Sequence, residues 1–198
     1  MKLCIFSGTF NPIHRAHLKM AEYVLENFGF DKIIFIPAYK PPHKDYDTNM
    51  CTHRFNMVKL AIEYNPYFEI SDIEYQHEGK SYSYLTALQL KKQYCTKDKI
   101  NFIIGTDAFE KIESWYEAEK FKNLVDFIVF VRENKTVNFD DLKEKGYSFE
   151  IARMPFIDIS STELRERIKE GKSISNLVTE EVEEYIYKNG LYRNTEMA

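Results

Sequence analysis

Short apolar runs that alternate with segments of helical periodicity constrain the fold of this chain more than any other sequence feature. The runs have the length and the β-branched content of strands that are buried in a parallel sheet. They are Leu3–Phe6, Lys32–Pro37, Ile100–Ile104 and Asp126–Val131. Between the first two, Leu18, Ala21, Val24 and Leu25 follow Asn11-Pro12 at helical spacing. The order strand, helix, strand predicts βαβ units and therefore an α/β fold.

The remaining segments complete this pattern. We expect a helix capped by Thr52 and ending before Asn65-Pro66, and a terminal helix near Val182–Tyr187. Further predicted elements are a strand at 68–73, a helix at 83–93, a polar surface helix and loop at 134–147, and a strand at 157–159. The chain has 198 residues, of which 44% are hydrophobic and 15% aromatic. This is enough to build the core of a single domain over residues 1–198.

Charge and cysteine usage exclude several classes of protein. The net charge is −4, so the sequence lacks the broad basic surface that non-specific nucleic-acid binding needs. Cys4, Cys51 and Cys95 show no C-x-x-C spacing, which favours a reducing, cytoplasmic location over a disulfide framework or a zinc site. No apolar stretch has the length of a membrane span, and no signal-peptide pattern precedes the first strand, so no membrane association is expected.

The segment from Gly8 to His17, G-T-F-N-P-I-H-R-A-H, joins the first predicted strand to the first predicted helix. A helix N-terminus offers unpaired N–H groups and partial positive charge, which together attract phosphates. Gly8 allows a ligand to approach the backbone closely. His14 and His17 are three residues apart, so they share a helix face and can point at one phosphate. A connecting turn with two solvated histidines is the alternative.

A second segment, I-D-I-S-S-T-E-L-R at residues 157–165, also leads into a predicted helix through hydroxyl residues. Ser160, Ser161 or Thr162 can cap this helix, and Arg165 lies about one turn later. The arginine can therefore reach an anion held by the exposed N–H groups. Helix capping without any ligand is the alternative explanation.

Three further segments carry candidate binding residues. Gly105-Thr106-Asp107 follows a buried strand, and Asp107 either caps the next helix or accepts hydrogen bonds from a ribose. Trp115, the only tryptophan, either packs on the core or offers a platform to a flat ring. The loop at 38–49 holds Pro41-Pro42-His43-Lys44 and offers lysine to a phosphate, or it is a solvated loop.

Taken together, the segments at 8–17 and 159–165 resemble the paired signatures of the nucleotidylyltransferase superfamily with the HxGH motif. Within it, P-P-H-K at 41–44, S-Y-S-Y at 81–84, F-I-I-G-T-D at 102–107 and W-Y at 115–116 are similar to bacterial nicotinate mononucleotide adenylyltransferases. The resemblance runs from residue 2 to about residue 192 and weakens at 133–150. Three residues differ from those common in the family: Ser7, Asn11 and Ala16. These differences could change how the loop at 8–17 fits the phosphates. Arg132 lacks the proline and glycine that often follow it.

The resemblance implies a Rossmann-like, doubly wound, mostly parallel sheet with helices on both faces and a small C-terminal helical segment. It implies adenylyl transfer from ATP to nicotinate mononucleotide in NAD biosynthesis, with Mg²⁺ delivered by ATP and no metal ligands from the protein. The implied catalytic residues are His14, His17 and Arg165. The implied ATP-binding residues are these three with Gly8, Thr9, Phe10, Gly105, Asp107, Ser161 and Thr162. The implied residues for nicotinate mononucleotide are Lys44, Ser83, Trp115, Tyr116 and Arg132, with His43 less secure.

Three other functions remain open from the sequence. Another enzyme of the superfamily, such as pantetheine-phosphate adenylyltransferase, would share the phosphate site and differ at the acceptor site. A nucleotide sensor would keep the fold without turnover. A zinc protein would use His14, His17, His43 and Cys51, although their spacing matches no familiar ligand pattern. The sequence does not fix the oligomeric state, and a homo-oligomer is compatible with it.

Overall fold

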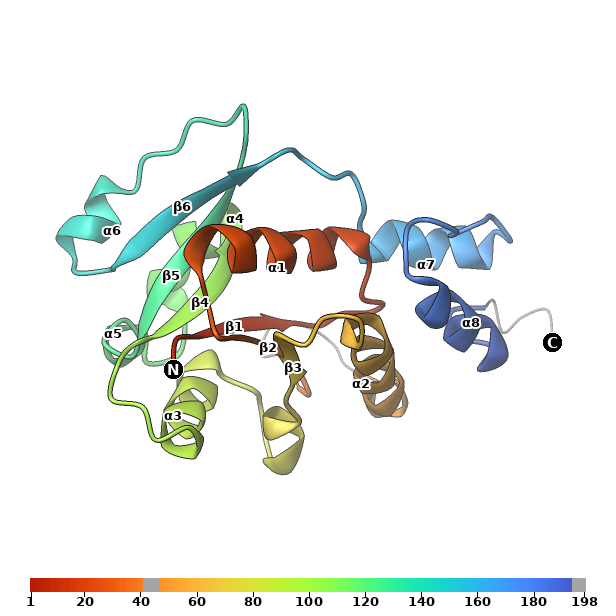
Figure 1. The fold of residues 1–198 in the computed structure, drawn as a ribbon, viewed down its shortest axis with the longest axis horizontal. Helices are drawn as coiled ribbons and strands as arrows, with labels where there is room; N and C mark the ends of the chain where they lie inside the picture. The colour runs from red at the N-terminus through yellow and green to blue at the C-terminus, as the bar shows by residue number, and fades with distance from the viewer. Residues whose placement is uncertain (41–46, 194–198) are drawn as a thin grey trace.

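Six parallel strands form one sheet at the centre of the molecule in the order β3-β2-β1-β4-β5-β6 (Figure 1). The computed structural model describes residues 1–40 and 47–193. The strands are β1 (Leu3–Gly8), β2 (Lys32–Pro37), β3 (Phe68–Ile70), β4 (Ile100–Gly105), β5 (Val125–Arg132) and β6 (Phe149–Met154). The α/β prediction is confirmed, and the sheet has the strand order of a doubly wound Rossmann-like fold.

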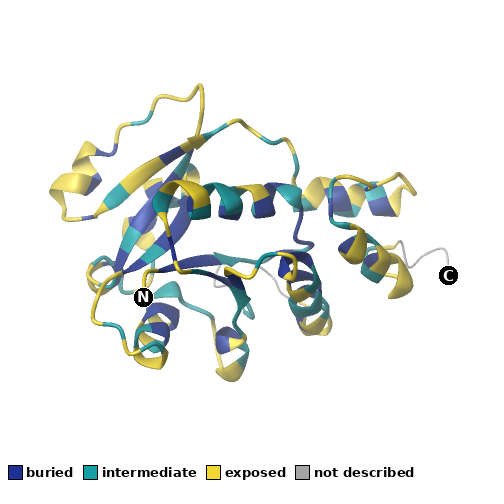
Figure 2. Cartoon of the chain, in the orientation of Figure 1, coloured by how far each residue is buried: buried dark blue, intermediate teal, exposed yellow. Residues whose placement is uncertain are grey.

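Helices cover both faces of the sheet because successive strand residues point to opposite sides. Phe6 and Phe35 belong to one core, whereas their neighbours Ile5 and Ile34 belong to the other. The first core is covered by α1 (Arg15–Phe28), α2 (Thr48–Ile62), α7 (Ser161–Lys169) and α8 (Glu180–Lys188). The second is covered by α3 (Ser83–Gln93), α4 (Thr106–Glu110), α5 (Ala118–Phe121), α6 (Asp140–Glu144) and the 3-10 turns η1 (Ile73–Gln76) and η2 (Ile112–Ser114). Figure 2 shows the buried strands between these partly exposed helices.

The chain reverses its winding direction between β1 and β4, which lie side by side in the middle of the sheet. The two strands pair at Cys4 with Asn101 and at Ile5 with Phe102. Beyond these pairs they continue to Gly8 and Gly105 at their carboxyl ends. Ligands of open α/β sheets bind outside the carboxyl ends of the strands at such a reversal point. In Figure 1, α7 and the start of α1 lie at this end of β1.

Several predicted boundaries are wrong. Helix α2 begins at Thr48, not after Thr52, because the Asp47 side chain accepts a hydrogen bond from the Asn49 backbone N–H at 2.8 Å and caps the helix earlier. The predicted strand at 68–73 ends at Ile70, and η1 follows it. The residues at 157–159 form no strand; the sixth strand is β6, at 149–154, which was predicted as neither strand nor helix. None of the helices in the described part of the chain is long and apolar enough to cross a membrane.

Candidate active site

The two histidines of the first motif stack at the start of α1. His14 is the residue before the helix and His17 lies in its first turn, so the rings overlap with centroids 3.7 Å apart and an angle of 24° between their planes. The backbone N–H of His14 donates a hydrogen bond to His17 Nδ1 at 3.1 Å. Because Nδ1 accepts this bond, the proton of the neutral His17 ring lies on Nε2. His17 Nε2 is therefore a hydrogen-bond donor.

Burial keeps both rings neutral near pH 7. It lowers the pKa of His14 from 6.5 to about 4, and His14 is only 6% exposed. Burial also lowers the pKa of His17 well below its usual value, and repulsion from His14 lowers it further. Within the described residues, His14 Nδ1 is buried without a hydrogen-bond partner. A buried nitrogen without a partner is costly, so the position of the His14 ring is set by its surroundings and not by this atom.

The loop before the histidines is shaped by one aromatic side chain. Phe10 adopts a left-handed backbone conformation with φ of 49°, and its buried ring lies 5.0 Å from the His17 ring between centroids. A Cβ atom on Gly8 would lie 3.1 Å from the Phe10 ring, so a larger residue would displace that ring. The small size of Gly8 admits the Phe10 ring, and the approach of a ligand to Gly8 stays a prediction.

Two hydrogen bonds join the two predicted anion motifs, which lie about 150 residues apart in the sequence. Ser161 Oγ, in the first turn of α7, donates to the carbonyl oxygen of Pro12 at 2.8 Å. Arg165 Nη1 donates to the carbonyl oxygen of Asn11 at 2.8 Å. Ser160 caps α7 by accepting from the Glu163 N–H at 3.1 Å. The N-termini of α1 and α7 therefore meet at the carboxyl edge of the sheet.

A cavity of about 430 Å³, which we call the histidine cavity, opens where the two helices meet. His14, His17 and Ser161 line it together with apolar side chains. Ala16 also lines it. The apolar lining comes from the middle of α1, the end of β5 and the segment after β6: Met20, Phe130, Val131, Met154, Pro155, Phe156, Ile157 and Ile159. An apolar wall beside an anion site suits a nucleotide, which has a flat base and charged phosphates.

A second cavity of about 600 Å³, the Asp107 cavity, lies beyond the end of β4. Gly105, Asp107 and Arg132 line it, and Arg132 also lines the histidine cavity. Asp107 is not the cap of α4, because Gly105 precedes that helix and Asp107 lies in its first turn. Its side chain is 92% exposed and lies 3.9 Å from Lys135 Nζ. The guanidinium of Arg132 lies 4.1 Å from the centre of the Phe156 ring.

The described residues that were predicted to bind the second substrate lie in three places. Tyr116 stacks on Tyr82 at 4.4 Å and lies 6.3 Å from Tyr84 between ring centroids, so Tyr116 and Ser83 belong to one surface region. Trp115 is half-buried against the second core, with Phe102 at 6.0 Å and Phe121 at 6.1 Å. Arg132 lies at the two cavities. Lys44 and His43 fall outside the described residues.

Two buried charges that support the site were not predicted. Arg54, only 3% exposed, donates from Nη1 to the carbonyl oxygen of Thr9 at 2.8 Å. Glu74 accepts hydrogen bonds from Thr86 Oγ1 at 2.9 Å and from the Tyr39 N–H at 3.3 Å, and burial raises its pKa. Arg54 interrupts an otherwise apolar face of α2, and a charge at such a position was a usable sequence signal.

Within residues 1–40 and 47–193, no group of three or more His, Cys, Asp or Glu side chains is arranged to hold a metal ion. The rings of His14 and His17 contact each other, and the His17 ring also contacts Phe10. Cys51 instead lies against Arg54, with Nη2 of the arginine 3.5 Å from its sulfur. The zinc-binding hypothesis is therefore unsupported by the described residues, and His43 lies outside them.

Comparison with known proteins agrees with this geometry. The model of the cytidylyltransferase-like family matches residues 5–167. The probable nicotinate-nucleotide adenylyltransferase of Caldicellulosiruptor saccharolyticus is 44% identical over 198 residues, covering 98% of this chain and all of the relative. The nicotinate-nucleotide adenylyltransferase of Bacillus subtilis is 40% identical over 196 residues, covering 98% of this chain and 99% of the relative.

A solved structure shares the fold. The nicotinic acid mononucleotide adenylyltransferase of Plasmodium falciparum, complexed with NaAD, matches with a TM-score of 0.78 at 23% identity and covers 96% of this chain and 97% of its own. The histidine pair, the second helix start and the full-length relatives lead to one conclusion. The chain belongs to the cytidylyltransferase-like family and, within it, to the nicotinate-nucleotide adenylyltransferases.

Proposed function

We propose that this protein transfers the adenylyl group of ATP to nicotinate mononucleotide in NAD biosynthesis, giving nicotinate adenine dinucleotide and pyrophosphate. A 5′-phosphate oxygen of the mononucleotide forms a bond to the α-phosphorus, and the bond from that phosphorus to the α–β bridging oxygen breaks. Pyrophosphate leaves with the bonding electron pair, so no protein nucleophile is needed. The joining of α1 and α7 through Ser161 and Arg165 carries this proposal, because it builds one site for a chain of phosphates.

His14 and His17 hold ATP phosphates and stabilise the charge that builds as the α–β bridge breaks. His17 Nε2–H is a donor held in place by the bond to Nδ1, and both histidines line the histidine cavity. Donors that are fixed before the reaction pay little reorganisation cost in the transition state. Neutral rings also take up charge when an anion binds, because a nearby negative charge raises the pKa of an imidazole.

Ser161, Thr162 and Arg165 hold the β- and γ-phosphates that leave as pyrophosphate. Arg165 donates one N–H to the Asn11 carbonyl and another to Thr162 Oγ1 at 3.3 Å. A guanidinium has five N–H donors, so others remain for phosphate oxygens. The backbone from Gly8 to Phe10 borders the same nucleotide, and Gly105 and Asp107 border its ribose.

For the acceptor, we propose that Trp115 stacks on the pyridine ring while Ser83 and the Tyr116 backbone meet its carboxylate. The placement of Tyr116 beside Tyr82 and Tyr84 supports a common site for Tyr116 and Ser83. Lys44 and Arg132 are proposed to meet the mononucleotide phosphate. Arg132 lines both the histidine cavity and the Asp107 cavity, so it is placed to contact either ATP or the mononucleotide. An Arg132→Ala variant whose KM rises for ATP alone would move this residue to the ATP site.

Mg²⁺ is proposed to arrive with ATP and to neutralise phosphate charge there. The described residues offer no carboxylate cluster for a protein-held metal, and Mg²⁺ is commonly bound through substrate phosphates with few protein ligands. We also propose that residues 1–198 act as one nucleotidyltransferase domain in the cytoplasm. The three free cysteines are compatible with that compartment.

A comparison of acceptors tests the proposed function. The purified chain is incubated with Mg²⁺, ATP and one of nicotinate mononucleotide, nicotinamide mononucleotide or phosphopantetheine, and dinucleotide and pyrophosphate are measured. We expect the highest kcat/KM with nicotinate mononucleotide. Preference for phosphopantetheine would assign the chain to the neighbouring enzyme class, and ATP binding without product from any acceptor would make it a nucleotide sensor.

A further inference from the structure

We propose that Tyr192 is a positioning residue for the reaction. Its hydroxyl donates a hydrogen bond to Asn11 Oδ1 at 2.6 Å, across 181 residues of sequence. Through this bond it holds the loop that presents the histidines to ATP. The inference rests on the proposed function and adds to it a residue outside both motifs.

Asn11 is held from two directions. Its backbone carbonyl accepts from Arg165 on α7, and its side chain accepts from Tyr192 beyond α8. The carbonyl of Pro12 is held by Ser161. A peptide carbonyl fixes only the position of the backbone, whereas the side-chain contact also fixes how residue 11 is turned. His14 lies three residues later, immediately before α1, so a loop that is fixed at Asn11 also fixes the approach of the chain to the histidines.

The structure holds Tyr192 in place for this contact. Leu191, its neighbour, is buried, and the Leu191 N–H donates to the Ile186 carbonyl at 3.0 Å, which joins the segment to α8. Tyr192 itself has φ of 63°, a left-handed conformation that is unfavourable for residues other than glycine. Its ring packs on the first core while its hydroxyl contacts Asn11. Burial raises the pKa of Tyr192, so the hydroxyl stays protonated and remains a donor.

This arrangement also gives a role to the Asn11 side chain, whose Oδ1 accepts the bond from Tyr192. An aspartate at residue 11 would offer the same oxygen acceptor to the tyrosine hydroxyl. The acceptor, and not the amide group, is therefore the feature that the loop needs. Substitutions at residue 11 show whether the loop needs the oxygen acceptor or the amide group.

A matched set of variants tests the inference: Tyr192→Phe, Asn11→Ala, the double variant, Asn11→Asp and Tyr185→Phe. Tyr185 is the control because it is also half-buried, on α8, and its hydroxyl bonds to His53 Nδ1 at 2.8 Å and Asn56 Nδ2 at 3.1 Å. Both tyrosine variants lose one buried hydroxyl. Only Tyr192→Phe loses a contact to the loop.

For Tyr192→Phe and Asn11→Ala we expect kcat/KM for ATP to fall about three- to tenfold, the usual effect of one hydrogen bond, with KM for nicotinate mononucleotide unchanged. The double variant should show no further loss, because each change removes the same bond. Asn11→Asp should keep most of the activity. Tyr185→Phe should lower Tm without changing these kinetic constants.

Wild-type kinetics in Tyr192→Phe, or losses that multiply in the double variant, would overturn the inference. A second readout needs no turnover: calorimetry with inorganic pyrophosphate should show weaker binding in Tyr192→Phe than in Tyr185→Phe. If the wild-type chain makes no dinucleotide, the proposed function fails, and the pyrophosphate titration alone decides whether Tyr192 positions the anion site. Equal pyrophosphate affinity in both variants would contradict the inference.

Discussion

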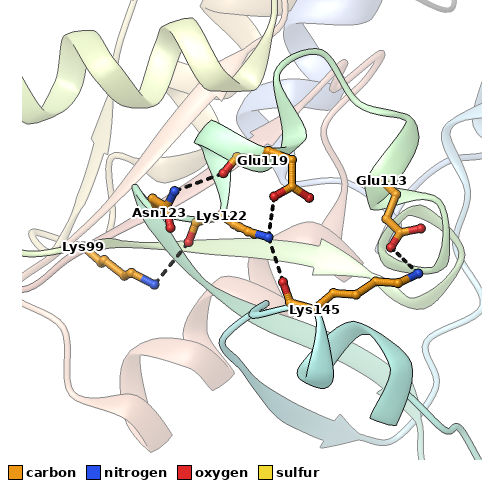
Figure 3. Close-up of polar contacts among 6 residues, drawn as sticks. All are labelled: Lys99, Glu113, Glu119, Lys122, Asn123 and Lys145. Carbon is orange, nitrogen blue, oxygen red and sulfur yellow. Dashed lines mark hydrogen bonds and ion pairs between the residues drawn. The ribbon is translucent and has the colours of Figure 1, made fainter.

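The two edges of the sheet use polar side chains in opposite ways. At the amino edge, Lys99, Glu113, Glu119, Lys122, Asn123 and Lys145 form the Lys122 cluster, whose polar contacts are drawn in Figure 3. Lys122 Nζ lies 2.6 Å from Glu119 Oε2 and donates to the Lys145 carbonyl at 2.7 Å, and Lys145 Nζ lies 2.7 Å from Glu113 Oε1. Each glutamate of this cluster is therefore paired with a lysine.

At the carboxyl edge, charged and polar side chains bind the backbone of one loop. Arg54 holds the carbonyl of Thr9, Arg165 that of Asn11 and Ser161 that of Pro12. The histidines that follow are neutral, and one of their nitrogens is buried without a partner. Paired surface charges contribute little to stability, whereas a fixed loop with unsatisfied groups is prepared for a ligand. Changes at the two edges should therefore have different consequences.

Replacement of His17 should have the largest effect. His17→Ala removes a fixed donor from the reacting phosphate, so kcat should fall on the order of a hundredfold or more. His77→Ala removes an exposed histidine that contacts Gln89 and serves as the control, with kcat expected near wild type. Steady-state kinetics on folded variants decides the result. Unchanged turnover in His17→Ala would show that the carboxyl edge does not perform the chemistry.

Acid should destabilise the carboxyl edge selectively. The pKa of His14 is about 4 in the folded protein and about 6.5 when unfolded, so below pH 6.5 the unfolded chain binds a proton that the folded chain does not. Stability is therefore lost as pH falls from about 6.5 toward 4, by roughly 2 kcal/mol at pH 5 relative to pH 8 from this residue. Urea unfolding at several pH values measures the loss. His14→Gln should reduce it, and an identical pH dependence in that variant would contradict the burial argument.

Replacement of Arg165 should separate the two substrates. Arg165→Ala removes a phosphate contact and the bond to the Asn11 carbonyl, so kcat/KM for ATP should fall about tenfold or more while nicotinate mononucleotide binding survives. Arg167→Ala is the matched control, because Arg167 lies on the same helix and its Nε donates to the carbonyl of Ser173, beyond the end of that helix. Calorimetry that shows lost mononucleotide binding with intact ATP binding would reverse the assignment.

Replacement of Lys145 should have the smallest effect. Lys145→Ala breaks exposed ion pairs to Glu113 and Asp141 but keeps the backbone carbonyl that Lys122 binds. The free energy of unfolding should change by no more than about 0.5 kcal/mol, and kcat should not change. Denaturant melts and the same kinetic assay measure both. A large loss of activity would remove the distinction between the two edges.

Local signals account for the parts that sequence predicted well. The apolar runs fix the central strands, and the spacing of His14 and His17 fixes their common face. The stacking of their rings follows from helix geometry at that spacing. The family resemblance implied that residues of both 8–17 and 157–165 bind ATP, and the bonds from Ser161 and Arg165 join the two segments.

The features that sequence missed depend on contacts between distant segments. Strand β6 carries exposed Glu150, Ile151 and Arg153, so it lacks the apolar run that marks the central strands. Its pairing with β5 fixes it instead. Tyr192 contacts Asn11 only because the C-terminal segment folds back over the loop, and the local sequence near residue 192 carries no sign of this. Long-range contacts of this kind leave no periodicity to detect.

Titration with inorganic pyrophosphate tests most directly the central claim that the starts of α1 and α7 form one anion site. Isothermal calorimetry compares the wild-type chain, His17→Ala, Arg165→Ala and their double variant. We predict one bound pyrophosphate per chain and weaker binding in either single variant, with effects that are not additive because both residues contact the same anion. Two independent pyrophosphates per chain, or affinity that changes in only one of the variants, would contradict the claim.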